Sequence, residues 1–580
     1  MAYGLQSLAK ANAKINRPMS GRTALLSLLL ASLICAGSCH PNRSRELVSD
    51  VQTPGALAGF VAIARQNQPI DLDALAAELG TSQAHWGSVV ATYARNQQRP
   101  LWFDAGFPRR QIQGLNAAVQ DLRADGLDPR HYDGQQVAKI ALRSATHAIA
   151  WTDEEIAIAD VQLTLAALKL VRDLQMGAAT PDKADRLWAH NDAIDYGALI
   201  YLSARAEQVA PVLRSLEPQH PQYRRLRDTL ARYRVLADTQ KWPAVAEDAH
   251  VKPGQSGPQI PGVRERLLAS GHLAHSNGSE LLDDELIAAI QIFQREHGLS
   301  DDGVPGKDTL SAMNISIAER VRQLEINLER WRWLPEDLGD THVLVNVPTY
   351  QLSAVENRRL VLQMRVVAGS ARTPTPIFHS AMQSVVFSPY WNIPRSILRG
   401  EIRPALAKDP GYLERKNMEV LRNGQAVDLA EVDFSDPSVR VRQRPGAANS
   451  LGYVKFLFPN DFHVYLHDTP ADALFDRMAR NLSHGCVRLE KPVELARWVL
   501  RNQPEWTDEK IQSAMDSGRE KHVRLDKTIP IYIVYQTVWI ADDGMVLFAK
   551  DVYGHDLRQT QVYAKHFTSA APESASTVNL

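Results

Sequence analysis

Apolar residues are spaced in two different ways along the chain. From about Ser82 to Trp242 they recur every three or four positions, the spacing of helices that bury one face, and Ile156 to Leu174 is the clearest example. After about residue 340 they form short β-branched runs between turn residues, which is typical of strands. These runs are His342–Val347, Gln351–Val355, Leu360–Val367, Val385–Phe387 and Ile531–Val538. The pattern predicts a multidomain α+β protein with a helical N-terminal scaffold followed by a mostly β domain.

Breaks in this pattern indicate the domain boundaries. Residues 243–260 are rich in Pro and Gly, as linkers are. Residues 394–444 are polar and helix-prone and interrupt the strand rhythm, so we expect an inserted lid subdomain there. Residues 556–580 are rich in Ser, Thr, Ala and Gln, and we expect a flexible tail. The other predicted units are a helical scaffold domain over 82–242, a compact helical module over 261–314, a connecting helix over 315–339 and a mostly β domain over 340–555.

The N-terminal segment has the pattern of an export signal. Four basic residues precede an apolar run over 24–36, and no acidic residue occurs before Glu46. We expect residues 1–40 to be a signal peptide or signal anchor and residues 41–81 to be a tether. The apolar run is shorter than the ~20 residues that span a bilayer, which favours cleavage over anchoring. A membrane tether through residues 24–39 stays open as the alternative.

The cysteines divide between this segment and the body of the protein. Cys35 and Cys39 lie in the export segment, where small residues before Cys39 allow lipidation, although Ala36 stands where a lipoprotein signal normally has Leu. Cys486 is then alone in the mature body, so it has no partner for an internal disulfide. The same count excludes a metal site built from a cysteine cluster. Cys486 is therefore either buried and inert or reactive.

Composition narrows the possible functions. At 580 residues the chain is too long for a single core. The hydrophobic fraction of 44% and the charged fraction of 23% are ordinary for soluble globular domains. The formal net charge of −1 lacks the basic excess with which proteins neutralise phosphates. We therefore expect no nucleic-acid partner.

A short string near residue 486 combines the groups that thiol chemistry needs. It reads Ser483-His484-Gly485-Cys486-Val487-Arg488-Leu489, and His467 precedes Cys486 by nineteen residues. A cysteine nucleophile needs a nearby base, because an unassisted thiol is only a few per cent ionised at neutral pH. His467, at the end of an apolar strand, and His484 are the two candidate bases, either of which could pair with a thiolate.

The flanking residues of the string suit the same chemistry. Gly485 permits a tight turn and a close backbone approach, so that the N–H groups of Gly485 and Cys486 can form an oxyanion hole. Arg488 carries a fork of donors suited to a carboxylate. These residues indicate a thiol acyltransferase or peptidase, and the alternative is a buried cysteine beside a core histidine.

The compact module over 261–314 resembles a known binding domain. Phe293-Gln294, Gly298-Leu299 and Asp302-Gly303 to Gly306 stand where the small three-helix peptidoglycan-binding domain shows its motifs. The resemblance implies three helices and binding to peptidoglycan. Some copies of that domain act only as spacers, so both roles stay open.

The string S-H-G-C-V-R, preceded at this distance by His467-Asp468-Thr469-Pro470, resembles the catalytic signature of the L,D-transpeptidases, the YkuD-type domain. Further matching blocks are Val367-Ala368-Gly369, Thr373-Pro374-Thr375-Pro376, Tyr390-Trp391-Asn392-Ile393-Pro394, Arg442-Gln443-Arg444-Pro445-Gly446 and Gly452-Tyr453-Val454-Lys455-Phe456. The ordered set is similar to the large multidomain YcbB-like branch, which also has a helical scaffold and a peptidoglycan-binding module. The resemblance covers roughly residues 85–555.

This resemblance implies a two-step acyl transfer in the bacterial periplasm. Cys486 attacks the bond between meso-diaminopimelate and the terminal D-Ala of a tetrapeptide stem, and His467 carries the protons. A diaminopimelate amine of another stem then takes the acyl group, which gives a 3→3 cross-link, whereas water as acceptor makes the enzyme an L,D-carboxypeptidase. Neither a metal nor an organic cofactor is implied. The partners are peptidoglycan stem peptides and other wall-synthesis enzymes.

The resemblance also assigns roles to the neighbouring residues. A backbone carbonyl near Asp468 orients the imidazole, and His484 contributes mainly through its backbone, because many relatives have Ser there. The expected substrate-binding residues are Arg488, Tyr390, Trp391, Asn392 and Ser483.

Two other classes of protein could account for some of these features. A catalytically silent wall-binding protein would rely on the peptidoglycan-binding module, and the intact Cys486 and His467 pair argues against it. A papain-type peptidase places its cysteine early and its histidine far downstream, whereas here the histidine comes first. The sequence does not distinguish a second stem, an outer-membrane lipoprotein, a free D-amino acid or water as the acceptor.

Overall fold

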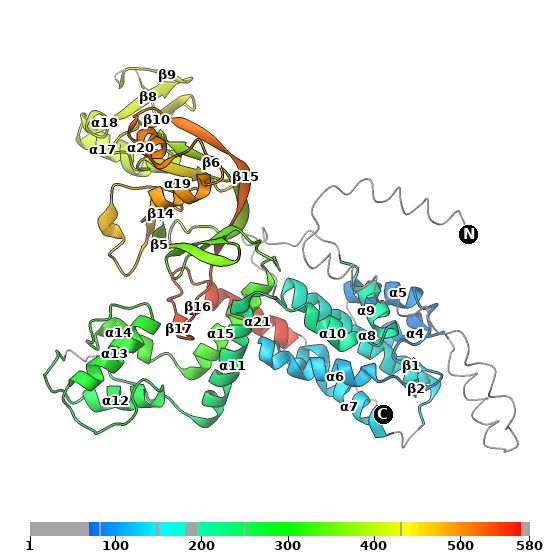
Figure 1. Ribbon diagram of the computed structural model, residues 1–580. Coiled ribbons are helices and arrows are strands. Elements are labelled where there is room, and N and C mark those ends of the chain that lie inside the picture. The colour runs from blue at the N-terminus through cyan, green and yellow to red at the C-terminus, as the bar shows by residue number, and fades with distance from the viewer. Residues whose placement is uncertain are drawn as a thin grey trace, which may run out of the picture.

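The computed structural model describes residues 69–79, 83–146, 150–179, 194–247, 251–335, 337–429 and 432–569. The export signal, the lipidation site at Cys39 and most of the tether lie outside the described residues. Within those ranges, no helix has the length and apolarity needed to cross a membrane. Figure 1 shows a helical scaffold, a small helical module and a sheet domain, with helices α11, α15 and α21 between them. The predicted α+β fold class is confirmed.

The scaffold packs around one long buried helix. Its helices are α4 (Leu72–Leu79), α5 (Gln83–Ala94), α6 (Gln111–Asp121), α7 (Gly134–Thr146), α8 (Asp153–Met176), α9 (Tyr196–Arg205), α10 (Val209–Ser215) and α11 (Pro221–Thr239). Helix α8 begins at a capping box formed by Thr152 and Glu155, which satisfies backbone N–H groups that the first turn leaves unpaired. Most of its side chains are buried, so the apolar period seen from Ile156 to Leu174 marks the centre of this domain.

The helical module has three helices, α12 (Ile260–Ala269), α13 (Asp284–Glu296) and α14 (Lys307–Met313). Gln294, one of its signature residues, is buried and donates to Asp302 Oδ1 (2.9 Å) and to the Val304 carbonyl (3.0 Å), and its amide oxygen accepts from Gly303 N (2.9 Å). These signature residues therefore hold the turn before α14. Helix α15 (Ile317–Arg332) follows and leads into the sheet domain.

The sheet domain is a closed barrel with one added strand. Its strands are β3 (His342–Asn346), β4 (Gln351–Glu356), β5 (Arg359–Gly369), β6 (Phe378–Phe387), β11 (Val454–Leu457), β12 (Leu466–His467), β13 (Asn481–Ser483), β14 (Val487–Leu489) and β15 (Lys521–Val534). The order is β13-β5-β14-β12-β11-β6-β15-β3-β4, and β4 pairs again with β5, which closes the ring. Helices α19 (Pro492–Leu500) and α20 (Asp508–Asp516) add side chains to its core.

The predicted insertion forms a separate small sheet at the top of the barrel in Figure 1. Its strands are β7 (Trp391–Asn392), β8 (Met418–Arg422), β9 (Gln425–Ala426) and β10 (Val439–Gln443), in the order β7-β10-β8-β9. Its helical turns are α16 (Arg395–Ile397), η5 (Leu398–Ile402), α17 (Arg403–Lys408) and α18 (Tyr412–Arg415). A cluster of buried residues, among them Ile397, Leu413 and Val441, gives this insert its own core.

The expected flexible tail over 556–580 is wrong for residues 556–569, which belong to a helix. After the hairpin β16 (Val538–Ile540) and β17 (Val546–Phe548), the chain forms helix α21 (His555–Ser569). The Asp551 carboxylate accepts the N–H groups of His555 (2.8 Å) and Asp556 (2.9 Å), which stabilises the first turn. Tyr563 is buried and donates to Glu329 on α15. Tertiary contacts therefore order a segment whose composition resembles that of a loose tail.

Candidate active site

The string around Cys486 forms a turn between two strands that both pair with the end of β5. Strand β13 runs parallel to β5 with Ser483 opposite Gly369, and β14 runs antiparallel to it with Arg488 opposite Val367. Gly485 lies between them with φ of +116°, a conformation that favours glycine. The short strands thus bring Ser483, Gly485 and Arg488 to one end of the barrel.

The Ser483 hydroxyl closes this turn from the inside. It donates to the Cys486 carbonyl (2.5 Å) and accepts the Gly485 N–H (3.1 Å), and the side chain is buried. Ser483 is predicted to bind substrate, but its hydroxyl is occupied within the turn. The Gly485 N–H, expected in an oxyanion hole, is likewise paired with Ser483 in this conformation. The Cys486 N–H has no hydrogen-bond partner among the described residues.

His467 is held in one tautomer by its own backbone. It ends β12, which runs parallel to β14 with His467 opposite Arg488. Its Nδ1 donates to the Asp468 carbonyl (2.5 Å), and because a carbonyl only accepts, Nδ1 carries the proton and Nε2 is the free base. Burial, together with the smaller effects of the Arg488 and Lys455 charges, lowers the pKa of His467 to about 3, although the hydrogen bond to Asp468 opposes the shift. The imidazole is therefore neutral at rest.

The Asp468 carboxylate fixes the strand ends beside the imidazole. It accepts the N–H groups of Tyr453 (2.7 Å) and Thr469 (2.7 Å), and burial raises the pKa of Asp468. Gly452 has φ of +59°, and a Cβ there would overlap the carboxyl group. Asp468 thus acts on the site through its backbone carbonyl, with its side chain holding the neighbouring backbone.

The Cys486 thiol is half-buried and has no imidazole partner. Its Sγ donates weakly to the His463 carbonyl (3.9 Å), and within the described chain it has no hydrogen bond to His467 or His484. Burial raises the pKa of Cys486, against the opposing effects of hydrogen bonds from Tyr465 and the charge of Arg488. The thiolate–imidazolium pair allowed by the sequence is therefore not the resting state.

Tyr465 is a site residue that the sequence reasoning missed. It lines the same pocket as Cys486, and burial followed by its interaction with the Cys486 thiol raises the pKa of Tyr465. The signal was available, because Tyr465 stands two positions before His467 and alternate residues of a strand share a face.

Lys455, opposite His467 on β11, donates to the Tyr390 carbonyl (3.3 Å) and lies 3.6 Å from Glu520.

These groups line a pocket of about 800 Å³ between the barrel and the insert. The barrel wall includes Tyr465, His467, Cys486 and Arg488. The insert wall includes Trp391, Asn392, Ile397, Leu398 and Glu401. The pocket therefore joins the predicted catalytic residues to two of the three aromatic and amide residues expected to bind substrate.

Tyr390 does not line this pocket. The Arg442 guanidinium lies over the Tyr390 ring, with its central carbon 4.0 Å from the ring centre. Arg442 also pairs with Glu419 (2.5 Å). The Tyr390 backbone N–H donates to Glu520 (2.9 Å). Tyr390 therefore helps to fix the junction between insert and barrel.

His484 points to the insert. Its Nε2 lies 2.6 Å from Glu401 Oε1 on η5, and both side chains are about half exposed, at 50% and 53%. This contact connects the catalytic turn to the far wall of the pocket. His484 is therefore engaged with the insert, which separates its role from that of His467.

Arg488 supplies a cation without a partner. Its guanidinium lines the pocket and makes no hydrogen bond or ion pair within the described ranges, and burial lowers its pKa while Cys486 opposes that shift. A buried guanidinium with open donors is suited to a carboxylate of a ligand. The same ranges contain no group of three or more His, Cys, Asp or Glu side chains that could hold a metal ion.

Comparison with known protein families gives three matches. The profile “L,D-transpeptidase catalytic domain” (YkuD) matches residues 340–523. A “Scaffold domain” matches residues 87–230, and a “Putative peptidoglycan binding domain” matches residues 256–313. Each match falls on one of the three bodies described above. The YcbB-like branch stays a prediction.

One curated relative and several solved structures are similar to parts of the chain. A Haemophilus influenzae protein named “Putative L,D-transpeptidase” is 34% identical over 242 residues, which cover 40% of this chain and 48% of that protein. The match thus spans about half the length of that relative. An L,D-transpeptidase structure from Stackebrandtia nassauensis is 14% identical over 50% of this chain and 96% of its own, with a TM-score of 0.20. One from Mycobacterium smegmatis is 12% identical over 34% and 58%, with a TM-score of 0.17.

The family match places the turn with Cys486 and the strand with His467 inside one domain. Residues 340–523 are therefore an L,D-transpeptidase catalytic domain, in a chain that also carries a scaffold domain and a peptidoglycan-binding domain.

Proposed function

We propose that this protein forms 3→3 cross-links in peptidoglycan, with Cys486 as nucleophile and His467 as proton carrier. The observation that carries the proposal is the pocket of about 800 Å³, where a thiol, a neutral imidazole and an unpaired guanidinium share one wall. Acyl transfer from a peptide needs these three functions: a nucleophile, a base and a group that holds the donor. The catalytic-domain match gives the class of reaction.

In the first step, Cys486 Sγ attacks the carbonyl between diaminopimelate and the terminal D-Ala of a tetrapeptide stem. The thiol proton passes to Nε2 of His467, which is unprotonated because Nδ1 is bonded to Asp468. The C–N bond then breaks, and His467 returns the proton to the departing D-Ala amine. The product of this step is a thioester on Cys486.

The developing oxyanion needs donors that the resting turn still has free. The Cys486 N–H has no partner among the described residues, whereas the Gly485 N–H is bonded to Ser483. The Tyr465 hydroxyl, which lines the same pocket as Cys486, is the second donor that we assign to the oxyanion. Arg488 pairs with a carboxylate of the stem and so sets its position.

In the second step, the side-chain amine of diaminopimelate on another stem attacks the thioester. His467 accepts its proton, the C–S bond breaks, and the thiol is restored. Water in place of the amine would release a tripeptide and make the same site an L,D-carboxypeptidase. A lipoprotein or a free D-amino acid would enter by the same chemistry, because each presents an amine.

The insert acts as a lid that favours the amine over water. Its residues form one wall of the pocket, and Glu401 contacts His484 of the catalytic turn at 2.6 Å. Removing residues 394–444 is expected to raise hydrolysis at the expense of cross-linking. Unchanged product ratios in that variant would contradict a lid role.

The cellular setting follows from the same chemistry. Peptidoglycan lies outside the inner membrane, so we place the protein in the periplasm, with residues 24–39 as signal or tether and Cys39 as the candidate lipidation site. The peptidoglycan-binding domain would hold the enzyme at its substrate. Other wall-synthesis enzymes are the proposed protein partners.

Intact-protein mass spectrometry with a disaccharide-tetrapeptide tests the proposal. The wild type should gain an adduct at Cys486 with loss of D-Ala, followed by a cross-linked dimer, and Cys486→Ala should show neither. If folded, reduced wild-type protein gave neither adduct nor product, the proposed transpeptidase activity would be refuted and a wall-binding role supported.

A further inference from the structure

The segment after the β16–β17 hairpin reaches the catalytic turn through one tyrosine. Tyr553 is buried, and its hydroxyl donates to the Gly369 carbonyl (2.6 Å) and accepts the Thr375 N–H (3.2 Å). Tyr553 lies outside the residues of the catalytic-domain match. Its contacts nevertheless fall on two blocks that adjoin the nucleophile.

Thr375 carries this contact to the turn itself. Its hydroxyl accepts the Gly369 N–H (2.8 Å) and donates to the Gly485 carbonyl (2.8 Å). Thr373 and Ser370 add bonds to the Ser483 carbonyl, from Thr373 Oγ1 (3.1 Å) and from Ser370 N (2.9 Å). The loop over 369–375 is therefore bonded to both residues that flank His484.

This loop has little freedom to shift. A Cβ on Gly369 would overlap the Thr373 carbonyl and the Thr375 nitrogen, so the backbone there is already in close contact. A tyrosine hydroxyl that both donates and accepts fixes two backbone groups of this loop at once. Phenylalanine would leave a carbonyl and an N–H of a buried loop without that partner.

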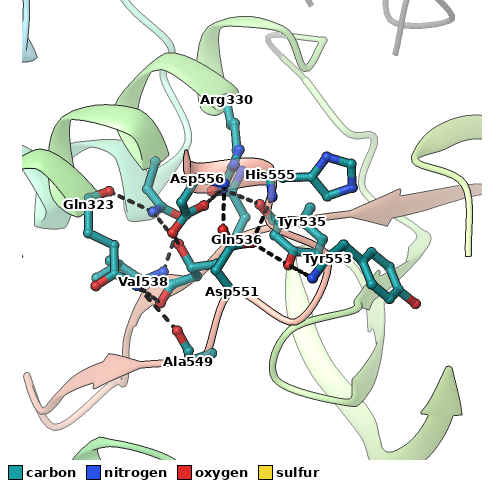
Figure 2. Close-up of polar contacts among 12 residues, drawn as sticks. Gln323, Arg330, Tyr535, Gln536, Val538, Ala549, Asp551, Tyr553, His555 and Asp556 are labelled. Carbon is teal, nitrogen blue, oxygen red and sulfur yellow. Dashed lines mark hydrogen bonds and ion pairs between the residues drawn. The ribbon is translucent and has the colours of Figure 1, made fainter. Parts of the chain in front are cut away.

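Tyr553 is itself anchored to helix α15. Its N–H donates to the Tyr535 hydroxyl (2.9 Å), which donates to Asp551 (2.7 Å). Arg330 of α15 donates to the Tyr535 carbonyl (3.0 Å) and pairs with Asp556 of α21 (2.7 Å). Figure 2 shows the backbone of Tyr553 joined to this cluster while its ring projects away from it. The cluster thus fixes the starting point of the side chain.

From this geometry we propose that Tyr553 is a positioning residue for the Cys486 nucleophile, acting through Thr375 and the Gly485 carbonyl. The inference rests on the proposed function for its kinetic consequence. Tyr553 does not line the pocket, so it holds the turn without touching substrate. Loss of its hydroxyl should therefore lower the rate of acylation and leave substrate affinity nearly unchanged.

Tyr553→Phe tests this against a matched control, Tyr532→Phe. Tyr532 is also a buried barrel tyrosine whose hydroxyl donates to a backbone carbonyl, that of Leu338 (3.2 Å), on the α15 side of the domain. With a disaccharide-tetrapeptide, Tyr553→Phe should lower kcat by about 10- to 100-fold with KM within about threefold. Tyr532→Phe should change kcat by less than about twofold, and both melting curves show whether the proteins are folded.

The next bond in the chain gives a second, independent variant. Thr375→Val removes the hydroxyl and should reproduce the kcat loss, whereas Thr375→Ser keeps it and should restore most of the activity. The Tyr553→Phe and Thr375→Val losses should combine to less than their product, because both break one path. Additive losses would overturn the inference. Equal effects of Val and Ser at position 375 would overturn it even if Tyr553→Phe fails to fold.

Amide hydrogen exchange of residues 482–487 separates this inference from the proposed function. Faster exchange in Tyr553→Phe than in Tyr532→Phe supports positioning even if the wild type forms no cross-link. Equal exchange and equal kcat in the two variants would overturn positioning even if the wild type is an active transpeptidase.

Discussion

The resting site is predicted to hold a neutral thiol beside a neutral imidazole, and pH-dependent alkylation tests this directly. Burial raises the pKa of Cys486 and lowers that of His467 to about 3. A thiolate–imidazolium pair requires the opposite order, with the imidazole pKa above that of the thiol. The two shifts therefore predict a nucleophile that is not ionised before substrate binds.

The expected pH dependence of the alkylation rate follows from the titration of each group. A thiol with a pKa of about 9 is about 1% ionised at pH 7, and burial of Cys486 makes the fraction smaller. An imidazole with a pKa near 3 is protonated in only about one molecule in 10⁴ at that pH. Alkylation of Cys486 by iodoacetamide should thus rise about tenfold per unit from about pH 6 to pH 8.

The assay follows the Cys486 peptide by mass spectrometry, which separates it from Cys35 and Cys39. His467→Gln should leave this alkylation profile nearly unchanged and lower transpeptidation by about 10²- to 10⁴-fold. In urea, where burial is lost, the same thiol should ionise at lower pH. The neutral pair would be refuted if the rate of Cys486 alkylation were constant from about pH 5 to pH 8 in the wild type and lower in His467→Gln.

Four further predictions concern the pocket, the residues beside it and the donor stem. Arg488→Met, which keeps length without charge, should raise the KM of the tetrapeptide about 10- to 100-fold in steady-state assays, because a charge-assisted bond contributes ~1.5–3 kcal/mol. Gly452→Ala should lower the free energy of unfolding in urea by about 1–3 kcal/mol, because its φ is +59° and its Cβ would overlap Asp468. Glu401→Gln, which weakens the contact with His484, should change stability by less than about 1 kcal/mol but raise the ratio of hydrolysed to cross-linked product in mass spectra. A donor stem with an amidated diaminopimelate carboxylate should lose kcat as well as affinity in the same steady-state assay.

Much of the barrel was predictable because its strands carry local signals. The runs beginning at His342, Gln351 and Leu360 coincide with β3, β4 and most of β5. Most of β6 and β15, residues 378–384 and 521–530, was missed, since polar residues such as His379 and Arg524 alternate with buried ones there. Their strand character comes from antiparallel pairing with each other as neighbours in the sheet, which no local sequence pattern indicates.

The candidate site was likewise predictable only where residue types and their order carry the signal. Cys486, His467 and Arg488 share a chemistry that their types and order indicate, and the structure brings all three into one pocket. The contact of His484 with Glu401 joins residues 83 positions apart in the chain, so it depends on how the insert folds back. The occupied Gly485 N–H depends on the rotamer of Ser483, which sequence does not specify.

The charges around His467 connect recognition of the donor to its activation. Burial, and after it the charges of Arg488 and Lys455, lower the pKa of the His467 imidazole, which makes it a weak base. A stem carboxylate that pairs with Arg488 would offset one of these charges and raise the pKa of His467 toward its ordinary value. The imidazole would then accept the thiol proton most readily when a carboxylate-bearing donor is in place. Arg488 thereby ties the basicity of His467 to the identity of the donor, which is why an amidated stem should lose turnover and not affinity alone.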